Sequence, residues 1–257
     1  MIFLIMEEMN LYIKELRIDG SLNEDFYYAK IPAIRQLENE TLHFEKPVTF
    51  FIGENGSGKS TLMEAIAIAM GFNPEGGTKN FVFSSRDSHS DLYKHLVIAR
   101  SAYPKDGFFL RAESFYNFAS TVDNLNGGGV RPLIDSYGGV SLHEQSHGES
   151  FLALVKNRFA GKGIYLLDEP EAALSPARIM QLLVCIHDLV QKDSQFIICT
   201  HSPILMSYPG ADLFEFDENG IRKSEYMETE HYRITKAFID KPERMYQHLF
   251  DEREEEE

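Results

Sequence analysis

A nine-residue stretch, Gly53–Thr61, constrains the fold of this chain more strongly than any other part of the sequence. It reads Gly-Glu-Asn-Gly-Ser-Gly-Lys-Ser-Thr and meets the pattern G-x-x-x-x-G-K-[ST] without a gap. The apolar and β-branched residues 48–52 precede it and are typical of a buried strand. Residues 61–70 follow it, are rich in helix formers and end before Gly71. A strand, a glycine loop and a helix in this order predict a phosphate-binding loop.

The chemistry of phosphate binding explains why these residue types occur at this spacing. Glycines allow successive backbone N–H groups to point inward at an anion, and the helix N-terminus adds partial positive charge. We expect Lys59 to reach the β- and γ-phosphates of a nucleoside triphosphate and the Ser60 hydroxyl to ligate Mg²⁺. The residues expected to hold the nucleotide are Asn55, Gly56, Ser57, Gly58, Lys59, Ser60 and Thr61.

Further candidate residues follow two other apolar runs. Residues 164–167 end in Asp168 and Glu169, and a buried strand expected at 195–200 ends at His201. The carboxyl ends of parallel strands face the same rim as a phosphate loop. Asp168 suits Mg²⁺, directly or through water, and Glu169 suits a base that deprotonates the attacking water. His201 can hydrogen-bond a γ-phosphate. The structural alternative is a helix-capping acid pair and a packed histidine, which the phosphate loop disfavours.

The order of elements along the chain predicts an α/β fold. Apolar runs that alternate with helical segments favour a mainly parallel sheet covered by helices on both faces. Short β segments before the phosphate loop indicate an N-terminal antiparallel β subdomain, and a turn at 104–107 predicts a hairpin of 97–100 with 108–113. Other strands are expected at 11–18, 33–37 and 41–44, a hairpin at 213–226, and helices at 115–125, 151–159, 176–192 and 235–250, the last interrupted near Pro242.

Composition and charge limit the possible partners. The formal net charge of −15 argues against a broad, sequence-independent grip on nucleic acid, although a local basic groove stays possible. No stretch approaches the length of an apolar membrane span, so we expect no direct membrane insertion. The apolar start at residues 1–6 is too short for a signal peptide. Two cysteines without metal-site spacing, Cys185 and Cys199, fit a reducing compartment. We therefore expect a cytoplasmic protein.

The motifs together resemble those of ABC-type ATPases, and the resemblance covers nearly the whole chain. Gly53–Thr61 matches the Walker A loop of that superfamily, 164–169 its Walker B strand, and 171–175 stands where its D-loop would be. His201 matches the switch histidine. Residues 145–149 match the L-S-G-G-Q signature, with histidine in place of the first glycine and glutamate in place of the final glutamine. That glutamate resembles the chromosome-maintenance and repair branch more than transporters.

The resemblance implies the cofactors and a dimer. ATP and Mg²⁺ would be bound, and two chains would sandwich two ATP molecules head to tail, so that Ser146 and Gly148 would contact the γ-phosphate held by the partner chain. ABC ATPases usually carry a glutamine at the junction to their helical lobe, but residues 61–144 contain none. Glu113 is the positional candidate to bind Mg²⁺ through water. A polar helix cap at Ser146 and a solvated loop acid at Glu113 are the alternatives.

The resemblance also sets the expected domain organisation. Fewer than 90 residues separate Ser60 from Ser146, without a heptad run, which excludes a long coiled-coil arm and favours the compact, stand-alone bacterial AAA/ABC ATPases. Tyr27 and Tyr28 are upstream candidates to stack on adenine, with ordinary strand packing as the alternative. The expected parts are a single domain at 1–250, with a core lobe at about 11–113 and 163–250 and a helical lobe at about 114–162, and an acidic tail at 251–257.

Three functions follow as hypotheses. The first is an ATP hydrolase that dimerises on ATP and drives a conformational switch of an unknown protein partner, with DNA repair and defence as candidate settings. The second is the ATP-binding subunit of an ABC transporter, which the missing glutamine and the altered signature disfavour. The third is an ATP-gated binding module with little hydrolysis. Catalysis in the first would rest on Glu169, His201 and Lys59.

Overall fold

The computed structural model describes residues 11–74, 76–77, 90–112 and 147–251, the last range without the side chains of its two end residues. Several expectations fall outside these residues. They are the Mg²⁺ role of Glu113, the phosphate contact of Ser146, the helix at 115–125, most of the helical lobe and the acidic tail at 252–257.

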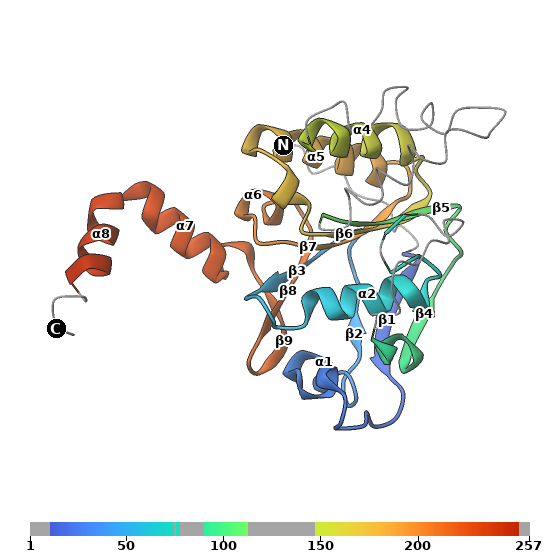
Figure 1. Cartoon of the computed structure of the whole chain (residues 1–257). Helices are drawn as coiled ribbons and strands as arrows, with labels where there is room; N and C mark the ends of the chain where they lie inside the picture. Colours follow the sequence, from blue (N-terminus) through green and yellow to red (C-terminus); the bar gives the residue numbers. More distant parts are fainter. Residues whose placement is uncertain (1–10, 75, 78–89, 113–146, 252–257) are drawn as a thin grey trace.

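A six-stranded sheet forms the centre of the molecule, in the order β5-β6-β7-β3-β8-β9 (Figure 1). Its neighbouring strands run parallel except for β8 and β9, which form the expected antiparallel hairpin. The expectation of a mainly parallel sheet is confirmed. The strands are β3 (Val48–Gly53), β5 (Asp106–Arg111), β6 (Gly163–Asp168), β7 (Gln195–Cys199), β8 (Asp212–Asp217) and β9 (Gly220–Ser224).

A smaller antiparallel sheet lies beside it. It has the order β2-β1-β4 and confirms the expected antiparallel β subdomain. Its strands are β1 (Ile13–Ile18), β2 (Leu42–His43) and β4 (Leu96–Arg100). Gln195 at the start of β7 joins the two sheets, because its side chain both accepts from the backbone N–H of Ile13 and donates to the carbonyl of Ile13, at 2.9 Å each.

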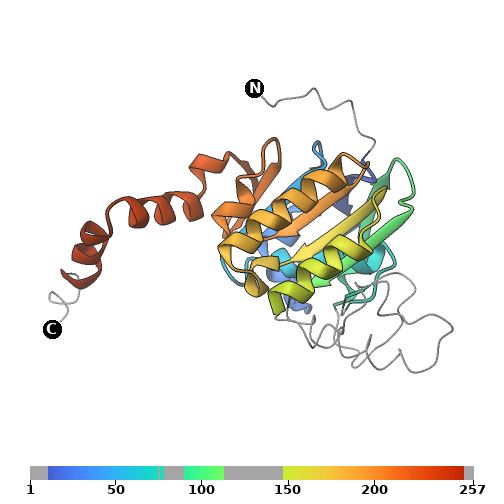
Figure 2. The same cartoon turned by 90° about the horizontal axis from the view of Figure 1, so that it is seen from above.

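Side chains that alternate along the central strands build two apolar cores. Phe51, Leu166 and Ile197 enter the core that contains the small sheet, α1 (Pro32–Gln36) and α2 (Lys59–Ala69). Their neighbours in sequence point to the opposite face, onto α4 (His147–Arg158), α5 (Pro176–Val190) and α6 (Pro203–Met206) (Figure 2). This period of two is the pattern of a sheet buried on both faces.

Two expectations about short segments are wrong. Residues 33–37 were expected to form a strand, but residues 33–36 belong to α1 and Leu37 is its C-cap. Pro32 occupies the first turn, and the buried Ala33, Ile34 and Leu37 follow helical spacing. The strands at 97–100 and 108–113 do not form a hairpin. β4 is half-exposed and pairs with β1, whereas β5 is largely buried and joins β6 in parallel, because its apolar run is covered on both faces only there.

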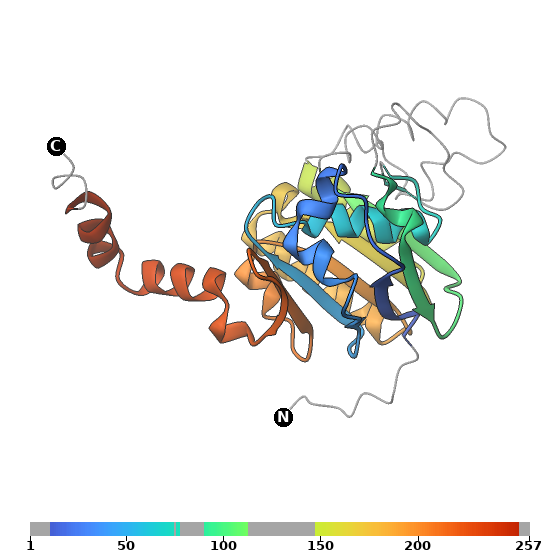
Figure 3. The same ribbon diagram turned by 90° about the horizontal axis from the view of Figure 1, so that it is seen from below.

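The C-terminal arm, residues 230–251, extends away from the rest of the molecule (Figures 1 and 3). It consists of α7 (Glu230–Asp240) and α8 (Pro242–Asp251), so the expected break at Pro242 is confirmed. In the described part of the chain, no helix is long and apolar enough to cross a membrane. Among the described residues, the other elements are short 3₁₀ turns: η1 (Tyr27–Lys30), η2 (Asp91–Lys94), η4 (Pro170–Ala173) and η5 (Tyr226–Glu228).

Candidate functional site

The phosphate loop connects the end of β3 to the start of α2. Gly53, Gly56 and Gly58 have φ values of 131°, 82° and 102°, in the left-handed region that side chains disfavour. A Cβ atom on Gly53 would lie 2.1 Å from the carbonyl oxygen of Phe216, and one on Gly58 would lie 2.7 Å from Ile31. Backbone angles and close packing therefore explain why glycine stands at these two positions.

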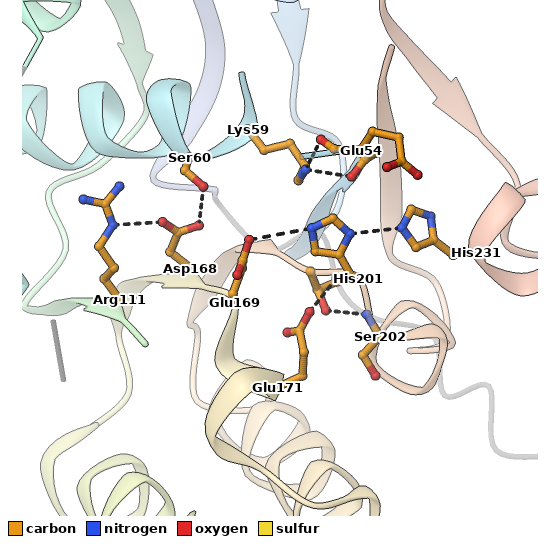
Figure 4. Close-up of polar contacts among 12 residues, drawn as sticks. Glu54, Lys59, Ser60, Arg111, Asp168, Glu169, Glu171, His201, Ser202 and His231 are labelled. Atoms are coloured by element: carbon orange, nitrogen blue, oxygen red, sulfur yellow. Dashed lines mark hydrogen bonds and ion pairs between the residues drawn. The ribbon is translucent and has the colours of Figure 1, made fainter. Parts of the chain in front are cut away.

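Lys59 opens α2 with its side chain folded back into the loop. Its Nζ donates hydrogen bonds to the carbonyls of Gly53 and Glu54, both at 2.7 Å, and the residue is only 3% exposed (Figure 4). Burial lowers the pKa of Lys59, against the opposing effect of nearby acids. The buried ammonium of Lys59 is bonded to neutral carbonyls, so an anion that binds beside it would stabilise its charge. This suits a phosphate-binding role.

A cluster of polar side chains lies beside the loop. Ser60 donates from Oγ to Asp168 at the end of β6, over 3.0 Å. Arg111, the last residue of β5, contacts the other oxygen of Asp168 at 3.1 Å and Glu64 of α2 at 3.1 Å. β5 and β6 are in register at this point, with Arg111 opposite Asp168. The topology thus brings one hydroxyl, two carboxylates and one guanidinium together. Figure 4 shows Ser60, Asp168 and Arg111 of this cluster.

The donor set of this cluster fits Mg²⁺. Among the described residues, no group of three or more His, Cys, Asp or Glu side chains forms a closed metal site. Mg²⁺ does not need one, since it is usually held by one or two carboxylates together with phosphates and waters. Ser60 and Asp168, which are already in contact, would supply the protein ligands when a nucleotide brings its phosphates.

Glu169 follows Asp168 in a strained conformation. Its φ and ψ of 52° and 50° are left-handed, which is uncommon for a residue with a side chain, and its N–H donates to the carbonyl of Cys199 at 3.0 Å. The side chain is 38% exposed, and its Oε1 lies 3.6 Å from Nε2 of His201. Strain of this kind gathers at functional sites, and the conformation presents the carboxylate at the rim of the sheet.

His201 is held from two directions. Its backbone N–H donates to Glu171 of η4, and its Nδ1 lies 3.1 Å from Nε2 of His231 at the start of α7 (Figure 4). Burial, and then the positive charge of Lys59, lower the pKa of His201. A neutral imidazole therefore faces Glu169 across the rim.

The expected signature is described only from its third residue onward. Gly148 lies in the first turn of α4, and a Cβ there would be 2.5 Å from Nη1 of Arg178 and 2.9 Å from the carbonyl oxygen of Ala173. Glu149, which stands for the usual glutamine, pairs with Arg178 at 2.9 Å. The start of α4 thus packs directly against the segment after Glu169. Packing alone accounts for Gly148, and its contact with a partner's phosphate stays a prediction.

The two candidate adenine-stacking residues differ in exposure. Both lie in η1 rather than in a strand. Tyr28 is fully buried and stacks on Phe26 with ring centroids 5.2 Å apart, so it is a core residue. Tyr27 is exposed at 61%, and Ile31, four residues later, touches the loop at Gly58. Only Tyr27 keeps a side chain that is free to stack on a base.

The site contains three residues that the sequence analysis did not single out: Arg111, Glu64 and His231. Glu64 carried a weak signal, because it follows Ser60 by four residues and so shares its face of α2. Arg111 ends an apolar run as Asp168 does, but the hairpin interpretation placed it elsewhere. His231 carried no local signal, since it follows His201 by 30 residues and meets it only through the tertiary fold.

Comparisons with known proteins match two parts of the chain to ATPase-type families. A family model described as an AAA domain matches residues 30–104, and a second, described as "AAA domain, putative AbiEii toxin, Type IV TA system", matches residues 135–207. The guanosine import ATP-binding protein NupO of Bacillus subtilis is 25% identical over 184 residues. That match covers 65% of this chain but only 35% of the relative.

Solved structures share the fold at low sequence identity. The structure of cbiO1 from Clostridium perfringens, part of the ABC transporter complex cbiONQ, has a TM-score of 0.52 and 16% identity over 93% of this chain and 99% of that chain. The SMC head domain from Thermotoga maritima has a TM-score of 0.46 and 14% identity over 84% of this chain and 100% of that chain. Together with the phosphate loop, the Asp168–Glu169 pair and His201, the two AAA-domain matches and the fold shared with cbiO1 support an ABC-type P-loop ATPase.

Proposed function

We propose that this chain binds Mg-ATP and hydrolyses it, with Glu169 as the general base. The observation that carries the proposal is the convergence of Glu169, His201 and the Ser60–Asp168 pair on one rim beside Lys59. The Glu169 carboxylate is exposed enough to meet water, and the neutral imidazole of His201 lies within 4 Å of it.

Each side chain has a separate task in this proposal. Lys59 would leave its two carbonyl partners to bind the β- and γ-phosphates. Ser60 and Asp168 would hold Mg²⁺, which would neutralise the developing phosphate charge. Glu169 would accept the proton of the attacking water, and His201 would hold the γ-phosphate in line.

Steady-state phosphate release by the purified chain tests this function. Wild type should release phosphate from Mg-ATP, and Lys59→Ala should lose turnover by at least about 100-fold because it removes the main cationic contact. Glu218→Gln is the matched control, since Glu218 is an exposed acid at the tip of the β8–β9 hairpin. Wild-type release no higher than that of Lys59→Ala would reject the enzyme and favour an ATP-gated binding module with little hydrolysis.

We further propose that two chains close on ATP. Gly148 and Arg178 bring the start of α4 against Ala173, so the candidate signature and the segment after Glu169 belong to one packed surface. Glu169→Gln should keep ATP bound without cleaving it and accumulate as a dimer. Light scattering after gel filtration with saturating Mg-ATP checks this. A variant that stays monomeric would show that the site does not need a second chain.

A transporter subunit is the second candidate function. The Bacillus relative is named a guanosine import ATP-binding protein, and the cbiO1 structure is part of a transporter complex. This chain would then need a membrane-embedded partner. Co-purification of Glu169→Gln with a membrane protein in the presence of ATP would favour transport.

The biological setting of the switch is also a proposal. The description of the family matched at residues 135–207 includes a putative toxin, which supports a role in defence more than one in DNA repair. The acidic charge disfavours a nucleic acid as the direct partner, and the free thiols Cys185 and Cys199 fit a cytoplasmic location. A pull-down with Glu169→Gln and ATP, carried out in a detergent-free lysate, would capture the unknown protein partner.

A further inference from the structure

His231 is fixed in place by a well-ordered helix start. It is the second residue of α7, and that helix begins directly after the buried N-cap Thr229. The Thr229 hydroxyl accepts from the N–H of Tyr232 at 3.3 Å and donates to the carbonyl of Tyr226 at 2.8 Å. A cap of this kind stabilises the first turn of a helix. The imidazole of His231 therefore reaches the nucleotide site from a defined backbone position, although the rest of the arm is exposed.

The geometry of the two histidines limits where their protons can be. Nδ1 of His201 and Nε2 of His231 are 3.1 Å apart, which is a hydrogen bond in which one nitrogen donates and the other accepts. Two N–H groups cannot face each other at this distance. The tautomer of one ring thus determines the tautomer of the other.

Glu169 is too distant to choose the tautomer of His201 by itself. Its oxygen lies 3.6 Å from Nε2 of His201, beyond a hydrogen bond, and this Nε2 has no hydrogen-bond partner among the described residues. To donate to a γ-phosphate or to Glu169, Nε2 must carry the proton. In a neutral ring Nδ1 must then be an acceptor, and His231 must donate to it from Nε2.

We propose that His231 is a positioning residue that holds His201 in the tautomer protonated at Nε2. The proposal rests on the function proposed for His201, and it adds a residue from outside the recognised motifs. It also places the start of the C-terminal arm one hydrogen bond from the side chain that contacts the γ-phosphate. For metal-binding histidines, partners that fix the tautomer typically affect affinity or activity by about 10- to 100-fold, and we expect an effect of this order for His201.

Two substitutions separate this role from simple packing. His231→Leu keeps an apolar side chain in the half-buried position but removes the hydrogen bond. His231→Gln places an amide that can donate at about the position of Nε2, so it should rescue the interaction. Glu230→Gln is the matched control, because Glu230 precedes His231 in the same turn and is exposed.

The first readout is the ¹⁵N spectrum of the full-length chain without nucleotide, with histidines labelled. Wild type, His231→Gln and Glu230→Gln should show His201 with a pyridine-like Nδ1 and a protonated Nε2. In His231→Leu the two His201 tautomers should mix. An unchanged His201 spectrum in His231→Leu would overturn the proposal. This measurement needs no turnover, so it stands even if the chain does not hydrolyse ATP.

The second readout is steady-state kinetics. His231→Leu should lower kcat by about 10-fold with KM for ATP changed less than about 2-fold, since the lost interaction orients a group and does not bind the adenosine. His231→Gln should recover most of kcat. A change confined to KM, or no recovery with glutamine, would contradict the proposal. Wild type without turnover would instead overturn the proposed function and leave the spectroscopic test to decide on the histidine pair.

Discussion

Replacing Arg111 with methionine should destabilise the chain and make its stability more sensitive to Mg²⁺. Arg111 pairs with both Asp168 and Glu64 at 3.1 Å, and the three side chains are 20%, 5% and 15% exposed. The guanidinium therefore offsets part of the negative charge of two carboxylates that are mostly removed from water. Methionine keeps an unbranched, apolar stem in place of the guanidinium and removes its charge, so the two acids would repel each other.

The expected size of the effect follows from burial. Removing one partner of a buried ion pair costs about 3–5 kcal/mol, and the partial exposure of Arg111 favours the lower end, about 3 kcal/mol. For a chain of this size, 1 kcal/mol shifts Tm by roughly 2–4 °C, which predicts a loss of about 6–12 °C. If Mg²⁺ binds the freed acids and its concentration is about 100 times its Kd, binding would restore about 2.7 kcal/mol of stability, which is most of the loss.

Thermal unfolding with and without Mg²⁺ measures this. Arg158→Met is the matched control, since Arg158 contacts Asp106 at 2.9 Å with side-chain exposures of 25% and 12%, at the opposite end of β5. Both variants should lose Tm, but only Arg111→Met should gain substantially more from Mg²⁺ than wild type does. Equal gains in the two variants would refute the assignment of Asp168 to a cation site.

Two further predictions concern the loop and the histidine pair. Gly58→Ala should weaken ATP binding by at least about 10-fold in calorimetry, because its φ is 102° and the new Cβ would meet Ile31; Gly20→Ala, also at positive φ but with open space around it, should not. Burial lowers the pKa values of His201 and His231 in the folded chain. Near and below the unfolded histidine pKa of about 6.5, the unfolded chain therefore binds more protons than the folded chain does, and stability should fall as pH drops through that value. The double variant with glutamine at both histidines should lose less Tm between pH 7.5 and 5.5, and equal slopes would contradict this.

Local sequence signals were sufficient for the parts of the site that lie at the ends of buried strands. β3, β6 and β7 are short apolar runs that end in residues with chemical function, so Lys59, Asp168 and His201 could be placed on one rim from sequence alone. The fold class followed from the alternation of these apolar runs with helical segments. The left-handed backbone of Glu169 could not be foreseen, because nothing in its residue type favours that conformation.

Pairing between distant segments set the limit of the sequence interpretation. A turn at 104–107 indicated a hairpin, but β4 and β5 belong to different sheets. Because the hairpin prediction was wrong, the position of Arg111 beside Asp168 was missed. Short apolar segments such as residues 33–37 fit a strand or a helix equally well, and Pro32 decided for the helix. His231 joins the site only because the chain returns to it after β9.

The most direct test of the account compares the binding of ATP with its cleavage in Glu169→Gln. Rapid-quench single-turnover measurements with excess enzyme give the rate of the chemical step, and calorimetry gives the affinity for Mg-ATP. We expect Glu169→Gln to bind Mg-ATP within about 3-fold of wild type and to cleave it at least about 100-fold more slowly, since glutamine keeps the shape but cannot accept the proton. Cleavage at the wild-type rate would contradict the central claim that Glu169 activates the attacking water.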